Sequence, residues 1–115
     1  MPTYMIVTIK KVKDRRSMDK YFEHVTGTFA NTGVKALSVY GSLKIVEGES
    51  SIDGMVLAEF PDMDAANQWY ADPAYQAIKH FRWEGADSSI VFLESGMSQS
   101  PDDWMPHTKD RVSAS

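Results

Sequence analysis

The residue best placed to do chemistry in this sequence is Arg82. It falls on one helical line with Tyr75 and Ile78, so its guanidinium should point towards the interior, where an unpaired charge is costly. There it could bind the carboxylate of a small molecule through two parallel hydrogen bonds. Alternatively, it forms a structural ion pair with Glu59 or Asp87, or its stem covers apolar surface while the charge stays in water. The sequence leaves these alternatives open.

Glu59 and His24 are the candidates for proton transfer. Glu59 stands in an apolar strand just before Phe60-Pro61, and a buried carboxylate can act as a general base. The alternative is that it alternates outward or caps a backbone amide. His24 lies on the flank of the first predicted helix, where a neutral imidazole suits proton transfer at a cleft, or is simply solvated. Together with Arg82, these two residues make the candidate catalytic set.

Aromatic residues provide the candidates for ligand binding. Tyr40 could donate a hydrogen bond to a ligand oxygen, or pack at a contact between two subunits. Trp69, Tyr75 and Trp83 fit a hydrophobic core, and alternatively they line an apolar cleft for a flat organic molecule.

Composition excludes several classes of function. Cysteine is absent, the three histidines are scattered, and the glycines form no phosphate loop, so we expect no metal and no cofactor. The net charge of −4, with acids and bases interspersed, argues against nucleic-acid binding. No apolar run approaches the roughly 20 residues that span a bilayer, and the start of the chain has no secretory pattern. We therefore expect a cytoplasmic protein.

The elements that must position these side chains are indicated by periodicity. Strands are predicted over 4–12, 35–47 with a bend at Gly41, 55–60 and 88–94. A helix capped by Asp14 or Ser17 runs to about residue 31, with Gly33 following as its terminating residue. A second helix begins at Asp62 after Pro61, breaks at Asp72-Pro73 and continues to about residue 84.

The order strand, helix, strand, strand, helix, strand is that of the α+β ferredoxin-like arrangement, with an antiparallel sheet and both helices on one face. The strands are apolar on both faces, although helices can cover only one. A second copy of the sheet would cover the other face, so we predict a homodimer. We expect one domain over residues 1–96. The segment 97–115 is expected either to be disordered or to dock on the partner through Trp104.

A block of motifs makes the sequence resemble the domain-of-unknown-function family 1330. The block comprises Glu59-Phe60-Pro61, Ala65-Ala66, Trp69-Tyr70 and Pro73-x-Tyr75-Gln76, then Arg82 and Ala86-Asp87-Ser88. Tyr4 to Ile9, Asp14, Tyr21 and Glu47-Gly48 extend the resemblance over about residues 3–95. The resemblance implies a dimeric α+β barrel, the superfamily that also contains cofactor-independent monooxygenases and lactone isomerases. It implies no agreed activity.

The chain departs from that family in its second strand. The family typically has an arginine followed by two glycines, where this sequence has Val39-Tyr40-Gly41.

The sequence leads to two hypotheses of function. The first is a small cofactor-independent enzyme that uses acid–base chemistry on an aromatic or lactone-like metabolite, in a cleft between helices and sheet. The second is a non-catalytic or stress-related homodimer that binds a small ligand. An empty apolar pocket with converging polar groups would favour the first.

Overall fold

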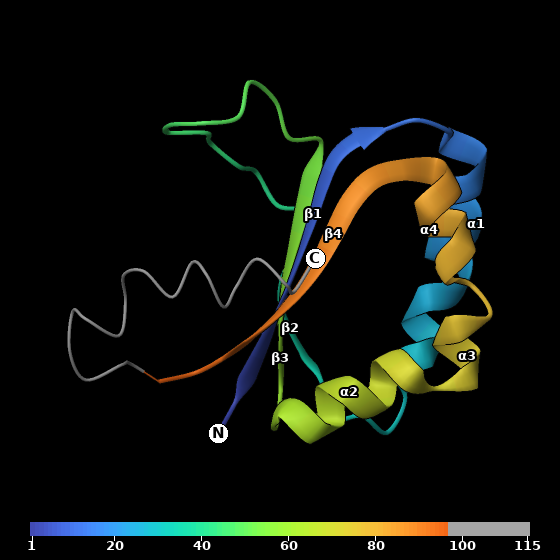
Figure 1. The fold of residues 1–115 in the computed structure, drawn as a ribbon, viewed down its shortest axis with the longest axis vertical. Helices are drawn as coiled ribbons and strands as arrows, with labels where there is room; N and C mark the ends of the chain where they lie inside the picture. Colours follow the sequence, from blue (N-terminus) through green and yellow to red (C-terminus); the bar gives the residue numbers. More distant parts are fainter. Residues whose placement is uncertain (97–115) are drawn as a thin grey trace, which may run out of the picture.

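The computed structural model describes residues 1–96, in which strands and helices follow one another in the predicted order (Figure 1). The elements are β1 (Thr3–Val12), α1 (Arg15–Val25), the 3₁₀ helix η1 (Thr26–Phe29), β2 (Lys35–Val39), β3 (Gly54–Phe60), α2 (Met63–Ala71), α3 (Pro73–Gln76), α4 (Lys79–Gly85) and β4 (Ala86–Glu94). The expectation that Trp104 docks on a partner concerns a residue outside the described part of the chain.

The four strands form one antiparallel sheet in the order β2-β3-β1-β4. The first and last strands of the fold, β1 and β4, lie side by side, and the helices pack against one face of the curved sheet (Figure 1). This is the ferredoxin-like α+β arrangement, as predicted. The buried side chains of β1 point towards the helices and meet Tyr21, Trp69 and Tyr75 in the core.

Two element boundaries differ from the prediction by more than two residues. The first helix is not continuous to residue 31, because its α-helical part ends at Val25 and a 3₁₀ turn follows. The second strand ends at Val39 rather than near residue 47, because Tyr40 adopts a left-handed backbone with φ of 52°. The irregularity in β2 lies between Ala36 and Ser38 and not at Gly41.

The caps at Asp14 and Asp62 and the helix break at Asp72-Pro73 agree with the prediction. The side chain of Asp14 accepts from the amides of Arg16 and Ser17, and that of Asp62 accepts from the amide of Ala65. Asp72 ends α2 and caps α3, in which Pro73 is the first residue. A further break between α3 and α4 was not predicted, but Arg82 in α4 is buried together with Tyr75 and Ile78, as their helical spacing indicated.

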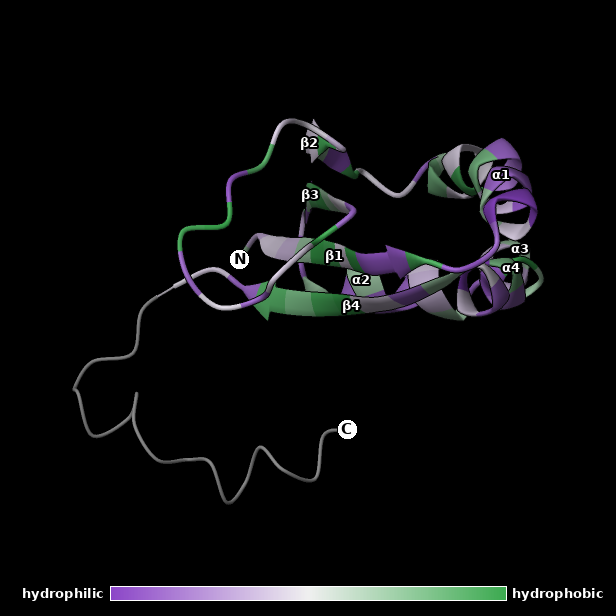
Figure 2. Cartoon of the chain, turned by 90° about the horizontal axis from the view of Figure 1, so that it is seen from above, coloured by the Kyte–Doolittle hydropathy of each residue, from purple (hydrophilic) through white to green (hydrophobic). Residues whose placement is uncertain are grey.

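The opposite face of the sheet carries no helix in the described part of the chain. The strand register places Ile6, Leu57 and Val91 side by side on this face, with Tyr4 and Leu93 next to them. Leu57, Val91 and Leu93 are 37%, 49% and 55% exposed. Viewed from above, hydrophobic stretches of β1 and β4 run next to each other (Figure 2). This apolar face is the feature from which the homodimer was predicted.

Candidate functional site

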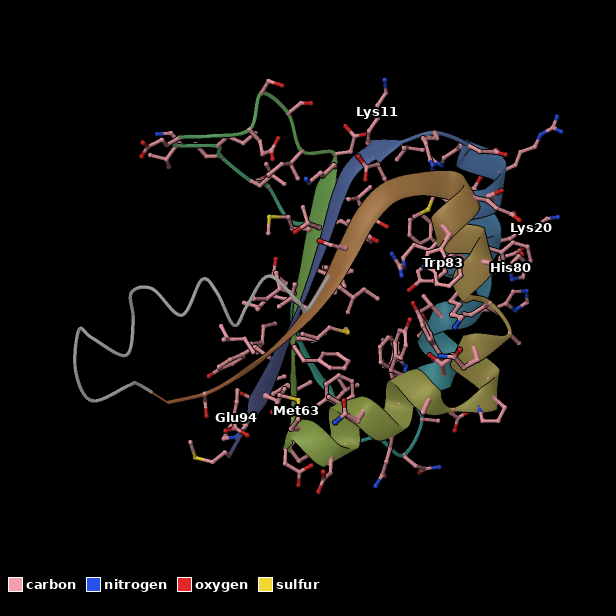
Figure 3. The ribbon with its side chains drawn as sticks, in the orientation of Figure 1. Lys11, Lys20, Met63, His80, Trp83 and Glu94 are labelled. Atoms are coloured by element: carbon pink, nitrogen blue, oxygen red, sulfur yellow. The ribbon has the colours of Figure 1, made fainter. Side chains whose placement is uncertain are left out.

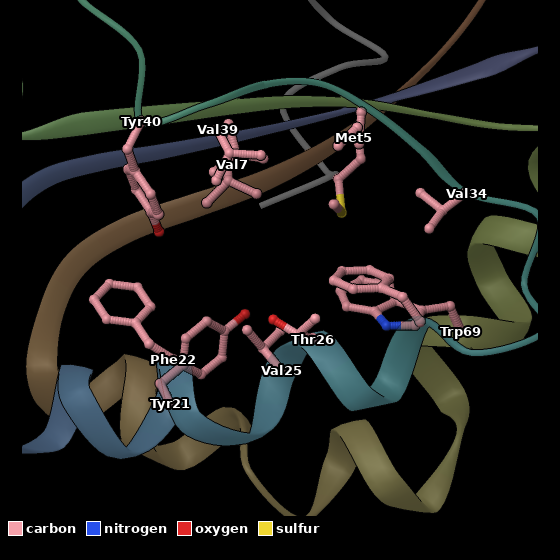
Figure 4. A pocket seen from close by; sticks show the side chains of 14 residues that line it. Met5, Val7, Tyr21, Phe22, Val25, Thr26, Val34, Val39, Tyr40 and Trp69 are labelled. Atoms are coloured by element: carbon pink, nitrogen blue, oxygen red, sulfur yellow. The ribbon is translucent and has the colours of Figure 1, made fainter.

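A cavity of about 440 Å³ lies between the sheet and the first helix. Its roof comes from β1, β2 and β3, its floor from α1 and η1, and Trp69 of α2 borders one end (Figure 4). The lining is predominantly apolar: Met5, Val7, Tyr21, Phe22, Val25, Thr26, Phe29, Val34, Ala36, Val39, Tyr40, Val56, Ala58 and Trp69. Pockets of this size and character typically hold small organic molecules.

Three hydroxyl groups supply most of the polarity at this cavity. Tyr21 and Thr26 carry theirs on the first helix and its continuation, whereas the hydroxyl of Tyr40 points down from the sheet (Figure 4). The lining residues include no carboxylate, imidazole or amine. The cavity can therefore offer hydrogen bonds to an oxygen atom of a bound molecule, but it has no charged group of its own to accept a proton.

A chain of polar contacts lies behind Tyr21. The hydroxyl oxygens of Tyr21 and Tyr75 are 3.0 Å apart, and Tyr75 is fully buried. The Nε atom of Arg82 donates a long hydrogen bond of 3.4 Å to the same Tyr75 hydroxyl, while its Nη1 atom donates to Ser88 Oγ at 2.7 Å. The first cavity is thus connected through two hydroxyls to a buried guanidinium.

The donors and acceptors available to each group indicate which hydroxyl donates at each step of this series of polar contacts. A guanidinium can only donate, so the Tyr75 hydroxyl accepts from Arg82. Either hydroxyl of the Tyr21–Tyr75 pair could donate by geometry, but Tyr21 is the remaining partner of the buried Tyr75 hydroxyl among the described residues, so we assign the Tyr75 hydrogen to Tyr21. Tyr21 then accepts from Tyr75 and keeps its hydrogen for a group in the cavity. In this direction the positive charge of Arg82 polarises Tyr75 and, through it, Tyr21.

Tyr21 and Tyr40, the two tyrosines that line the cavity, are neutral donors at neutral pH. Burial raises the pKa of Tyr21, and the neighbouring Tyr75 hydroxyl raises it further, while the charge of Arg82 opposes the shift. Burial also raises the pKa of Tyr40, again against the effect of Arg82. The hydroxyls therefore keep their hydrogens and can donate them to a carbonyl or an anionic oxygen.

Tyr40 is held in place by two neighbours. Its ring lies 5.5 Å from that of Phe22, edge to face. On the other side it lies so close to Gly54 that a Cβ atom there would be 2.7 Å from Tyr40 Cδ1. Tyr40 is thus accommodated because Gly54 has no side chain, and it brings a hydroxyl group to the cavity.

Trp69 forms a fixed wall of the cavity. Its indole Nε1 atom donates to Thr28 Oγ1 at 2.9 Å, and its ring stacks on Phe29 with the ring centres 4.9 Å apart. The side chain is 2% exposed. Packing and hydrogen bonding therefore fix the position of this indole before any ligand binds.

The structure separates the residues that the sequence grouped as one site. Tyr40 and Trp69 line the cavity, and Tyr75 stands behind Tyr21. Arg82 and Trp83 line a different pocket. Tyr21 is the residue that the sequence reasoning missed, because its place on the apolar stripe of the first helix indicated a core residue and nothing more.

The two candidates for proton transfer do not reach the cavity. His24 is exposed on α1 and is not part of the lining. Glu59 pairs with Tyr4 on the helix-free face of the sheet, the outward orientation that was its alternative interpretation. Neither Glu59 nor Asp87 forms the ion pair considered for Arg82, since the ion pairs within residues 1–96 are Lys10–Glu49 and Arg15–Asp19.

Residues 1–96 contain neither a metal-binding cluster nor a membrane-crossing helix. Among residues 1–96, no three histidine, aspartate or glutamate side chains converge so that they could hold a metal ion. In the same part of the chain, no helix combines the length and apolar character that crossing a membrane requires.

Most of the described sequence matches the profile of one protein family. Residues 2–96 match the sequence profile of the family described as domain of unknown function DUF1330. No protein of curated function is significantly similar to the sequence.

Solved structures resemble the fold. A protein of unknown function from Rhodopseudomonas palustris is 17% identical with a TM-score of 0.66, and 84% of each chain is covered. A dimeric ferredoxin-like protein of unknown function from Jannaschia is 15% identical with a TM-score of 0.65, covering 83% of this chain and 100% of that one. A protein from Caulobacter crescentus described as a "putative antibiotic biosynthesis monooxygenase" is 18% identical with a TM-score of 0.60, covering 84% and 91%.

Proposed function

The chain belongs to the DUF1330 family, and on this premise we propose that its cavity binds a small aromatic or lactone-like molecule and activates it through an oxygen atom. The observation that carries the proposal is the convergence of the Tyr21 and Tyr40 hydroxyls on an apolar cavity that the protein's own side chains do not fill. An apolar lining favours a flat organic body, and the two hydroxyls favour one acceptor oxygen on it.

The chemistry best supported by these groups is stabilisation of negative charge on a carbonyl or phenolic oxygen. Two neutral donors aimed at one oxygen act as an oxyanion hole when charge develops there during a reaction. The hydrogen bond from Tyr75 strengthens Tyr21 as a donor, and Arg82 acts on Tyr21 through its hydrogen bond to Tyr75 and through its positive charge. The enzyme in this proposal needs no group from His24 or Glu59, in contrast to the initial hypothesis.

A second candidate function is binding without catalysis. It is favoured by one observation, the lack of a carboxylate, imidazole or amine among the residues that line the cavity. A reaction that removes a proton would then depend on water or on the substrate itself. The similarity in fold to the Caulobacter crescentus protein supports a small-molecule function of either kind, because fold alone does not choose between them.

Coumarin, an aromatic lactone, and naphthalene, a similar shape without the carbonyl, are suitable probes. We expect coumarin to bind at least about tenfold more tightly than naphthalene, because only coumarin has an oxygen that can accept hydrogen bonds from Tyr21 and Tyr40. Tyr21→Phe and Tyr40→Phe should each reduce this preference, whereas Tyr70→Phe, which changes a tyrosine outside the cavity, should preserve it. The proposal fails if coumarin does not bind, or if both cavity variants bind it as tightly as the wild type.

A metabolite extract separates the two candidate functions. Native mass spectrometry of the purified protein identifies molecules that bind, and incubation of the extract with the protein shows whether any of them is consumed. Loss of a bound molecule in the wild type but not in Tyr21→Phe would support catalysis. Binding without consumption would favour the second candidate.

We also propose that the active form is a homodimer joined by the helix-free face of the sheet. Ile6, Leu57, Val91 and Leu93 give this face an apolar surface that water contacts in the single chain, and a stable interface buries about 1,600 Å² in total. The Jannaschia relative is described as dimeric. Light scattering should give twice the mass of 12.9 kDa at micromolar concentration, and Val91→Lys should shift the protein towards the monomer. A wild-type monomer would contradict the proposal.

A further inference from the structure

A second pocket of about 390 Å³ lies between β4 and the helices α2 and α4. β4 forms one edge of the sheet, so this pocket opens beside the sheet and not beneath its centre. It shares no lining residue with the first cavity. Its character also differs, because Arg82, Ser88 and Ser89 contribute polar groups beside the rings of Tyr70, Trp83 and Phe92. Figure 3 shows Trp83 on α4.

Arg82 is an unusual residue to find in such a pocket. Its side chain is 4% exposed, yet its two hydrogen-bond partners, Tyr75 and Ser88, are neutral hydroxyls. Neither of the ion pairs formed within residues 1–96 includes it. A guanidinium has five N–H donors, so two such contacts leave donors available. Burying a cation without a counter-charge is costly, and an anion in the pocket would offset that cost.

A second cation lies near the aromatic residues of the same pocket. The Nζ atom of Lys79 is 5.0 Å from the centre of the Trp83 ring and 5.7 Å from that of Tyr70. It also donates to Gln76 Oε1. The residues that line the pocket include no aspartate or glutamate. Arg82 and Lys79 therefore make the local field positive, and no lining residue cancels it.

We propose that this pocket binds a small aromatic carboxylate, with the carboxylate on Arg82 and the ring among Tyr70, Trp83 and Phe92. A guanidinium recognises a carboxylate with charge-assisted and often paired hydrogen bonds, and Ser88 and Ser89 add neutral donors. Aromatic walls next to the cation favour a flat ring over a bare anion such as phosphate. This site goes beyond the proposed function, and it does not depend on what the first cavity binds.

Nuclear magnetic resonance of the tryptophan indole N–H groups tests the proposal in the intact protein. Trp83 borders the second pocket, whereas Trp69 borders the first cavity and donates to Thr28, so the two signals report on different sites. Trp83→Phe and Trp104→Phe assign the signals. Millimolar benzoate should shift the Trp83 indole and the Arg82 Nε–H signal in a saturable manner and leave Trp69 unchanged. Neutral benzamide and inorganic phosphate should bind at least about tenfold more weakly.

Variants identify the groups that recognise the anion. Arg82→Met should weaken benzoate binding at least about tenfold. Lys79→Met should weaken it about two- to fivefold through loss of a partly solvated charge. Lys20→Met is the matched control, since Lys20 lies over Phe81 and not at the pocket. The wild-type titration and Lys79→Met keep the test decisive if Arg82→Met does not fold. The proposal is overturned if benzoate does not shift Trp83, if benzamide binds equally well, or if Lys20→Met and Lys79→Met have the same effect.

Discussion

Replacing the two hydroxyls of the Tyr21–Tyr75 pair, singly and together, measures whether the polar chain behind the cavity is as coupled as its geometry indicates. Tyr21→Phe leaves the fully buried Tyr75 hydroxyl without its 3.0 Å partner. An unsatisfied buried hydroxyl costs about 1–3 kcal/mol. Tyr75→Phe removes the same contact and also the acceptor of the Arg82 Nε hydrogen bond, so we expect it to be at least as destabilising.

The double variant distinguishes a shared interaction from two independent effects. Once one hydroxyl is gone, removing the other no longer breaks the bond between them. The double variant should therefore be less destabilised than the sum of the single variants, by about 1 kcal/mol.

Urea unfolding at one fixed protein concentration, followed by far-ultraviolet circular dichroism, gives these free energies. Circular dichroism is preferable to fluorescence, because the Tyr75 ring centre lies 4.2 Å from that of Trp69 and its replacement would alter the emission. Tyr70→Phe, at a half-buried tyrosine outside the chain of hydroxyls, is the control for loss of a hydroxyl. A coupling free energy below about 0.3 kcal/mol would refute the hydrogen bond between Tyr21 and Tyr75, on which the chain of contacts from Arg82 depends, because effects at uncoupled sites add to within that error.

Three other predictions use alkaline pH, a buried hydroxyl and a close contact. The raised pKa of Tyr21 means that the folded protein keeps a proton which the unfolded chain loses above the ordinary value of 10.0, so stability should fall above that pH by up to about 1.4 kcal/mol per pH unit; Tyr21→Phe should flatten this fall in urea titrations. Thr3 is fully buried, and its Oγ1 atom has no hydrogen-bond partner among the described residues; Thr3→Val should therefore raise the free energy of unfolding by about 1 kcal/mol, whereas a loss would show that this hydroxyl is satisfied. Gly54→Ala should cost about 1–3 kcal/mol in a denaturant melt, because the new Cβ atom would press on Tyr40; adding Tyr40→Ala should restore most of that loss, and an equal loss in both backgrounds would count against the contact.

The sequence alone determined the features that depend on neighbouring residues along the chain. Asp14, Asp62 and Asp72 cap their helices because a short carboxylate reaches amides two or three residues ahead. Helical spacing also placed Arg82 on the buried line of Tyr75 and Ile78, as observed. The apolar alternation of the strands, together with the order of the elements, was sufficient for the ferredoxin-like fold.

The ends of helices and strands could not be predicted from the sequence where tertiary contacts compete with local backbone preference. The strand predicted over 35–47 ends at Val39 because the backbone of Tyr40 turns to a left-handed conformation, which its contacts with Gly54 and Phe22 accommodate. Local periodicity contains no information about these contacts, because the residues that make them are distant in the sequence.

Only the tertiary structure decided which polar side chains meet. Tyr21 and Tyr75 are 54 positions apart, and the packing of α1 against α3 and α4 brings their hydroxyls together. Strand alternation already set Glu59 on the face opposite to Phe60, but only the placement of the helices showed that the cavity lies on the Phe60 side. The division of the candidate residues between two pockets likewise depends on the distance between sheet and helices. That distance is fixed by side chains from every element at once, and therefore no local pattern contains it.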